Sequence, residues 1–246
     1  MLMRLLERVE KRAQRWQGKG FGGAKALRAE VRAAVAHLPA SGGVVFDVGA
    51  NEGKWAKELL AQAGNRAGTV YCFEPSRVHH AALHALGDPR IVVVEKAVAD
   101  VAGRLPLYAD KPGSALASLA RRELGHYGID MKESETVEVT TVDQVMDEHG
   151  IATVDYAKFD VEGYEYKALL GARHALETKR LRAFAFEFGG TDIDTRTYFR
   201  DFWFLLTGYG YKIGIINPLG RPRPIEKYGE RLEVFRTTNF IAWIDR

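Results

Sequence analysis

The sequence is poor in cysteine and contains no long apolar run. Cys72 is the single cysteine among 246 residues, so an internal disulfide is excluded and a reducing compartment is allowed. No apolar stretch approaches the roughly 20 residues that a membrane-spanning helix needs. The first residues also lack the apolar core of a secretory signal peptide. We therefore expect no transmembrane segment and a cytoplasmic location.

A strong net charge is also absent, since the formal charge is +3 at pH 7. The excess lies at one end of the chain. Residues 1–35 carry nine Lys and Arg against three Glu, which leaves a balance of −3 for the remainder. The main part of the chain thus lacks the basic surface of a nucleic-acid-binding protein, and we expect no nucleic-acid partner.

The basic segment has the pattern of an amphipathic helix. Apolar residues recur at helical spacing opposite most of its Arg and Lys side chains, and they are Leu2, Leu5, Leu6, Val9, Ala13 and Trp16. Glycines between 18 and 23 end this pattern, and a second helix is predicted over 24–37. We divide the chain into a helical extension, residues 1–40, and a main domain, residues 41–246. The first helix has three interpretations: a solvated face on a packed appendage, a membrane-surface contact, or a partner site.

The segment from Val44 to Trp55 joins an apolar strand to a glycine-rich turn. Apolar residues surround Asp47, and Gly49 and Gly53 precede a predicted helix. Such glycines let the backbone approach a ligand, commonly a nucleotide-type cofactor. The acid would repel a pyrophosphate and attract a cationic amino acid group, and the GxGxxG spacing of dinucleotide binders is absent. An adenosine cofactor without phosphates, such as S-adenosylmethionine, fits best; a tight turn with no ligand is the alternative.

A second acid follows the next predicted strand. Residues 68–73 are mostly apolar, and Glu74 and Pro75 come directly after them. An acid about 20 residues beyond a glycine turn can hydrogen-bond ribose hydroxyls at the carboxyl end of a parallel sheet. Glu74 has this placement. It does not separate NAD from S-adenosylmethionine, because both carry a ribose diol.

Strands and helices alternate through the main domain, which predicts a parallel sheet with helices on both faces. The predicted strands are 44–48, 68–74, 91–98, 154–160, 182–188, 211–216 and 233–244, the last two as a possible antiparallel edge. Pro218, Pro222 and Pro224 predict a loop between these two. The interval 100–135 breaks the alternation and predicts an irregular substrate loop, before a strand-like stretch at 136–142.

Four motifs resemble the FkbM family of S-adenosylmethionine-dependent methyltransferases: F-D-V-G-A-N-E-G at 46–53, F-E-P-S at 73–76, A-V-A-D at 97–100 and K-F-D-V-E-G-Y-E at 158–165. The resemblance covers roughly residues 42–245. It implies a class I methyltransferase (Rossmann-like) fold, with a seven-stranded, mostly parallel sheet and helices on both faces. It also implies methylation of hydroxyls on sugars, polyketides or other secondary metabolites. In this architecture, N-terminal helices can cap the substrate side, so a lid is a further hypothesis for residues 1–40.

The predicted cofactor site places Asp47 near the methionine amino group, directly or through water, Glu74 near the ribose and residues 97–100 near adenine. Its members are Asp47, Gly49, Asn51, Gly53, Glu74, Pro75, Ala97, Val98, Asp100 and Asp160. For Asp100, a solvent-exposed turn is an equal alternative. The resemblance also implies a Ser-rich segment in the substrate loop, which Ser114 and Ser118 match.

Asp160 and Glu162 end the fourth strand, with their side chains on the same side. Either can act as general base for a hydroxyl, or both can hold a divalent cation that lowers the hydroxyl pKa. Glu187 at the end of the fifth strand is a third candidate. A structural alternative for Glu162 is capping of the helix that begins near residue 163. Lys158 shares the face of Asp160 and is a candidate ion-pair partner.

Two missing motifs narrow the range of atoms that can accept the methyl group. No Asn/Asp-Pro-Pro-Tyr/Phe element follows the fourth strand, as base-amine methylation would need, and no Pro-Cys nucleophile serves cytosine C5. We therefore predict an S-adenosylmethionine-dependent O-methyltransferase acting on a small molecule or glycan, with a divalent metal allowed but not required. An NAD(P)-dependent oxidoreductase and a non-catalytic cofactor-binding module remain alternatives. The aromatic cluster 198–204 is a candidate homo-oligomer contact, and a place in the core is the alternative for it.

Overall fold

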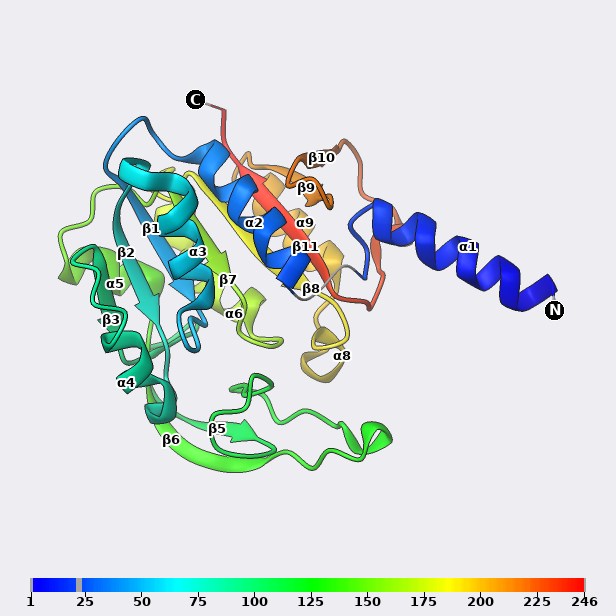
Figure 1. Cartoon of the computed structure of the whole chain (residues 1–246), viewed down its shortest axis with the longest axis horizontal. Helices are drawn as coiled ribbons and strands as arrows, with labels where there is room; N and C mark the ends of the chain where they lie inside the picture. The colour runs from blue at the N-terminus through cyan, green and yellow to red at the C-terminus, as the bar shows by residue number, and fades with distance from the viewer. Residues whose placement is uncertain (1, 21–23, 246) are drawn as a thin grey trace.

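The computed structural model describes residues 2–20 and 24–245, and an eight-stranded sheet forms its centre (Figure 1). From one edge to the other, the strands are β10 (Pro222–Ile225), β9 (Lys212–Ile216), β11 (Thr238–Trp243), β8 (Ala183–Phe188), β7 (Tyr156–Phe159), β1 (Gly43–Val48), β2 (Ala67–Phe73) and β3 (Ile91–Val94). The five strands from β8 to β3 pair in parallel, whereas β11, β9 and β10 pair antiparallel. The carboxyl ends of the parallel strands therefore meet at one edge.

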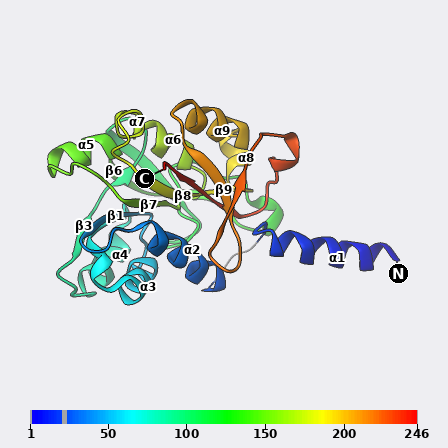
Figure 2. The ribbon, with the colours of Figure 1, turned by 90° about the horizontal axis from the view of Figure 1, so that it is seen from above.

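Helices cover both faces of this sheet (Figure 2). One face carries α2 (Ala24–His37), α3 (Lys54–Ala63) and α4 (Arg77–His84). The other carries α5 (Val142–Glu148), α6 (Glu165–Leu170), α7 (Arg173–Glu177) and α9 (Phe199–Gly208), and the short α8 (Asp192–Thr195) follows β8. Because both faces are covered, the central strands are apolar on both sides, as in the A-F-A-F-E-F sequence of β8.

A second, three-stranded sheet lies beside the carboxyl ends of the main strands (Figure 1). It is built from β4 (Ala97–Val98), β6 (Lys132–Thr140) and β5 (Gly103–Ala109). The interval predicted as irregular thus begins with a regular strand that pairs with β6, and only its middle, residues 110–131, is a loop. In β5, Leu105 and Leu107 recur at a spacing of two, which is the signal for this strand.

The predicted seven-stranded sheet needs correction, because β10 adds an eighth strand. Pro222 and Pro224 were predicted to lie in a loop, yet they belong to β10 and pair with β9. β10 is an edge strand. Proline has no N–H to donate, and this is tolerated at the edge of a sheet because no further strand pairs there. The predicted strand at 91–98 is divided between β3 in the main sheet and β4 in the small sheet. Three 3₁₀ turns complete the described elements: η1 (Gly64–Arg66), η2 (Gly125–Tyr127) and η3 (Glu230–Leu232).

The two N-terminal helices differ in how they pack. α2 lies on the sheet, and Ala29, Val31 and Ala33 on it are at most 1% exposed. In contrast, α1 (Leu2–Trp16) projects from the body and has no buried residue (Figures 1 and 2). The interpretation of the first helix as a packed appendage is therefore wrong for α1. The division at residue 40 stays a prediction, although the core that α2 shares with the sheet crosses it.

Candidate active site

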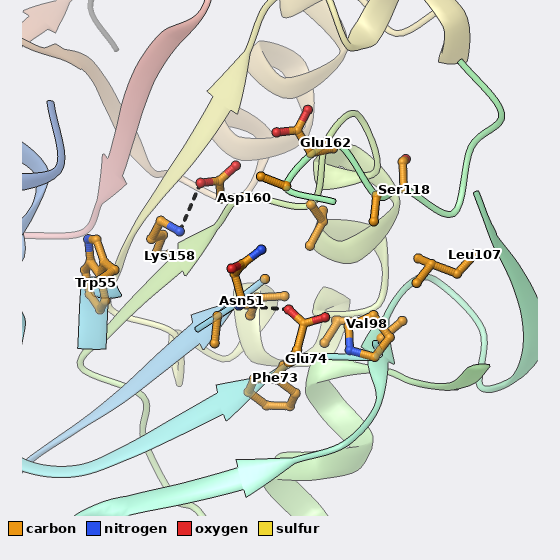
Figure 3. A pocket seen from close by; sticks show the side chains of 18 of the residues that line it. Asn51, Trp55, Phe73, Glu74, Val98, Leu107, Ser118, Lys158, Asp160 and Glu162 are labelled. Atoms are coloured by element: carbon orange, nitrogen blue, oxygen red, sulfur yellow. Dashed lines mark hydrogen bonds and ion pairs between the residues drawn. The ribbon is translucent and has the colours of Figure 1, made fainter. Parts of the chain in front are cut away.

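A cavity of about 300 Å³ lies at the carboxyl ends of β1, β2 and β7, beside the small sheet (Figure 3). Ligands of open parallel sheets bind in this position, and the volume is within the range of small-molecule sites. Seven of the ten residues predicted to bind a cofactor line it, and they are Gly49, Asn51, Glu74, Pro75, Ala97, Val98 and Asp160. Ser114 and Ser118 line it too, as does Trp55 from α3.

The glycine turn brings the backbone of β1 against the end of β7. Gly49 has a φ of +85°, which favours glycine, and a Cβ there would overlap the carbonyl oxygen of Asp160. The N–H of Gly49 donates to the carbonyl of Phe73 at 3.0 Å, which ties the turn to the end of β2. Gly53 does not line the cavity; a Cβ on it would press against Leu86, so packing of α3 requires this glycine.

Glu74 occupies the position predicted for a ribose ligand. Its Oε2 accepts the N–H of Asn51 at 2.8 Å, and its Oε1 accepts the N–H of Ser76 at 2.9 Å. Burial raises the pKa of Glu74, and these two N–H donors act in the opposite direction. Each carboxylate oxygen can accept a further hydrogen bond, so Glu74 is able to receive two adjacent hydroxyl groups.

Asp47 lies behind the cavity rather than in its wall. Its side chain is completely buried, and Lys158 Nζ stands 3.6 Å from its Oδ1 and 3.0 Å from Oδ2 of Asp160. Lys158 and Asp160 both line the cavity (Figure 3). Asp47 does not line it. The predicted pairing of Lys158 with an acid is therefore confirmed. Asp47 was predicted to contact the methionine amino group directly or through water; because Asp47 does not line the cavity and Lys158 does, only the direct contact needs correction.

Glu30 is a member of this charged group that sequence reasoning missed. It comes from α2, is 9% exposed, and accepts a hydrogen bond from Asn239 Nδ2 at 2.7 Å. Burial raises its pKa to about 7, Lys158 opposes the shift, and Asp160 and Asp47 add to it. A signal was available, because Glu30 falls at helical spacing among buried alanines of α2. An acid on the apolar face of a helix indicates a buried partner.

Glu162 stands at the mouth of the cavity and is held by a loop residue. Arg122 Nη1 lies 2.7 Å from Glu162 Oε2, and Arg122 is 9% exposed. Burial raises the pKa of Glu162 to about 7; Asp160 adds to the shift and Arg122 opposes it. The helix-cap alternative for Glu162 is wrong, because Glu165 accepts the N–H groups of Val161 and residue 163. Arg122 was not predicted from the sequence, because the loop that contains it has no periodic pattern.

A larger groove of about 1180 Å³ adjoins the cavity, and Glu162 lines both. Its other walls are the polar side of α1, the 110–131 loop and the chain after β8. Glu187 lines this groove and not the cavity. Burial raises the pKa of Glu187 well above its usual range, with Asp160 and Glu162 adding to the effect. The three predicted catalytic acids thus lie along one path from the cavity into the groove.

The structure does not place Asp100 in the cavity. Its Oδ2 pairs with Lys167 Nζ at 2.8 Å, as in the alternative of a turn acid. In residues 2–20 and 24–245, no three His, Cys, Asp or Glu side chains are arranged to hold a metal ion. We therefore derive no step through a divalent metal.

The sheet order and the site define a class of protein. Parallel strands β3, β2, β1, β7 and β8 with an antiparallel β11 beside β8, and a cavity above the β1 turn, form a methyltransferase-like α/β fold. The family model for the methyltransferase FkbM domain matches residues 47–213. The chain belongs to the FkbM methyltransferase family.

Two known proteins show how far the likeness extends. The chain is 35% identical over 161 residues to a 31-O-demethyl-FK506 methyltransferase FkbM from Streptomyces tacrolimicus, across 54% of this chain and 61% of that protein. It also resembles the crystal structure of methyltransferase FkbM from Methylobacillus flagellatus KT, with a TM-score of 0.53 and 18% identity. That match covers 83% of this chain and 44% of the other. The chain thus spans less than two thirds of either relative.

Proposed function

We propose that the protein is an S-adenosylmethionine-dependent O-methyltransferase that acts on a hydroxyl of a small molecule or glycan. One observation carries the proposal: Glu162 borders both the small cavity and the large groove, where a methyl donor and an acceptor would meet. Family membership supports methyl transfer. The name of the Streptomyces relative, a 31-O-demethyl-FK506 methyltransferase, supports oxygen as the acceptor atom.

The residues of the cavity fit the proposed cofactor. S-adenosylmethionine supplies a methyl group on a positively charged sulfur. Glu74 has accepting capacity for the ribose diol, and Asp160, whose side chain is 40% exposed, offers a carboxylate to the cationic amino group. Asp47 contributes by holding Lys158, which in turn orients Asp160. Both oxygens of Asp47 are buried, and Lys158 is the one cation paired with this carboxylate among the described residues.

Glu162 is the proposed general base. A base that works near neutral pH needs a pKa near 7, and burial gives Glu162 this value. Arg122 holds Oε2, which leaves Oε1 to take the proton of the acceptor hydroxyl. The proposed acceptor lies in the groove, whose wall includes the polar side of α1. Glu187, further along that wall, would contact the acceptor.

Calorimetric titration tests the cofactor. The protein should bind S-adenosylmethionine with micromolar affinity and bind NAD far more weakly. Replacing Glu74 with Gln places an NH₂ group against an N–H donor and removes one ribose acceptor, so affinity for S-adenosylmethionine should fall about 10–100-fold. Glu138→Gln, an exposed acid on β6, is the matched control and should bind as the wild type does. Tight NAD binding would overturn the proposal.

The rate of methyl transfer should depend on the ionisation of Glu162. The base must be deprotonated, so kcat should fall as the pH falls through about 7. Glu162→Gln should lower kcat roughly 10²–10⁴-fold and abolish this inflection. Release of S-adenosylhomocysteine with a panel of sugar and polyketide hydroxyls gives the rate. Glu187→Gln should keep the inflection; loss of it there and not in Glu162→Gln would assign the base to Glu187.

A further inference from the structure

The helix α1 presents an apolar face that nothing in the described chain covers. Its members are Leu2, Leu5, Leu6, Val9 and Trp16, and their exposed fractions lie between 51% and 69%. At 100° per residue they form one continuous stripe on a helix about 22 Å long. The opposite side of the helix borders the groove, through Glu7, Glu10, Lys11, Gln14 and Arg15. The apolar stripe therefore faces away from the body.

The charge of α1 indicates what this face contacts. The helix carries five Arg and Lys against two Glu, and none of the five forms an ion pair with any described residue. Arg8 and Arg12 lie beside the apolar stripe at helical spacing. An apolar face with Trp at its end and Arg along its side matches the headgroup and acyl boundary of an anionic bilayer.

We propose that α1 binds the surface of an anionic lipid bilayer, lying in the plane of the headgroups. A second copy of the chain fits less well. Five partly exposed side chains offer on the order of 500 Å², short of the roughly 800 Å² per partner in a stable interface. Two such helices would also bring like charges together. None of the helices in residues 2–20 and 24–245 has the length and apolarity to cross a bilayer, so the contact is peripheral.

Vesicle sedimentation with the full chain tests this proposal. We expect binding to phosphatidylcholine vesicles that contain about one third phosphatidylglycerol, and little binding to phosphatidylcholine alone. Leu6→Gln with Val9→Gln should weaken binding at least about tenfold, because the apolar contact is lost. Arg8→Gln with Arg12→Gln should weaken it by a similar factor through lost attraction. Lys57→Gln with Arg104→Gln removes the same charge from exposed sites elsewhere and should change little.

Three results would overturn the proposal: no binding of the wild type to anionic vesicles, equal binding to neutral vesicles, or unchanged binding of the Leu6 and Val9 double variant. A dimer in light scattering that this double variant abolishes, without vesicle binding, would assign the face to a second copy. Unfolding of the variants should match the wild type, since α1 contributes no buried side chain. Vesicle binding needs no methyl acceptor, so its outcome is independent of the proposed activity.

Discussion

Replacing Gly49 with Ala should abolish cofactor binding and destabilise the fold by about 2–5 kcal/mol. Two effects add up. The φ of +85° disfavours any Cβ, and this Cβ would overlap the carbonyl oxygen of Asp160. Asp160 is itself fixed by the bond from its N–H to the carbonyl of Val48 at 3.0 Å. Relief of the overlap must therefore part β1 from β7 at the point where the cavity begins.

Gly150 provides the matched control for this prediction. Its φ is +63°, and no atom lies within 4 Å of the Cβ that alanine would add. Gly150→Ala should therefore lower the free energy of unfolding only by the cost of a side chain at positive φ, about 1–2 kcal/mol. It should bind S-adenosylmethionine normally. Urea unfolding of both variants gives the free energy of unfolding, and calorimetric titration gives the affinity for S-adenosylmethionine. Normal cofactor affinity in Gly49→Ala would show that the turn tolerates a side chain and that its backbone does not approach the ligand.

The central strands and the glycine turn were predictable because their signals are local. Apolar runs that end in Asp47, Glu74 and Asp160 mark parallel strands buried on both faces, and the turn glycine follows the first of them. The alternation that put Lys158 and Asp160 on one face is confirmed by their 3.0 Å ion pair. Local pattern was therefore enough for the position of the cavity and for most of its wall.

The sequence-based predictions failed where tertiary contacts determine the position of a residue or strand. Asp47 and Lys158 are cross-strand neighbours in the β1–β7 register, and this register, which the sequence does not state, puts the ammonium between Asp47 and the cavity. Glu30 joins them only because α2 docks on the sheet. Arg122 reaches Glu162 across 40 residues from a loop with no periodic pattern. Strand β10 contains two prolines, which local rules assign to a loop and which the sheet tolerates at its edge.

Replacing Lys158 with Met should lower the free energy of unfolding by about 3–5 kcal/mol at neutral pH. The carboxylates of Asp160, Asp47 and Glu30 raise the pKa of this ammonium even though its burial acts against the charge. Asp160 is partly exposed and can be solvated by water, so it loses little. Asp47 is completely buried, and Lys158 is its one ion-pair partner in the described part of the chain. The loss comes from an uncompensated charge on Asp47.

The double variant Asp47→Asn with Lys158→Met separates this effect from lost packing. It removes both charges at similar volume and should recover most of the stability. A double variant as unstable as Lys158→Met alone would show that the packing of the lysine chain, and not its charge, matters.

The pH dependence of the single variant, Lys158→Met, gives a second check. Burial raises the pKa of Asp47, and the attraction of Lys158 acts in the opposite direction. Without the lysine, the folded-state pKa rises further above the unfolded value of about 3.9. A raised carboxyl pKa favours folding of the protonated form, so the loss of stability grows as the pH rises above that unfolded value. Glu30, with a pKa of about 7, faces the same ammonium and adds a contribution of the same sign. In urea unfolding, the free energy of unfolding of Lys158→Met should therefore fall further below that of the wild type at pH 8 than at pH 5. In the double variant, only the pH dependence that comes from Glu30 should remain. A deficit that does not change with pH would show that Asp47 carries no charge in the folded protein and that Lys158 serves Asp160 alone.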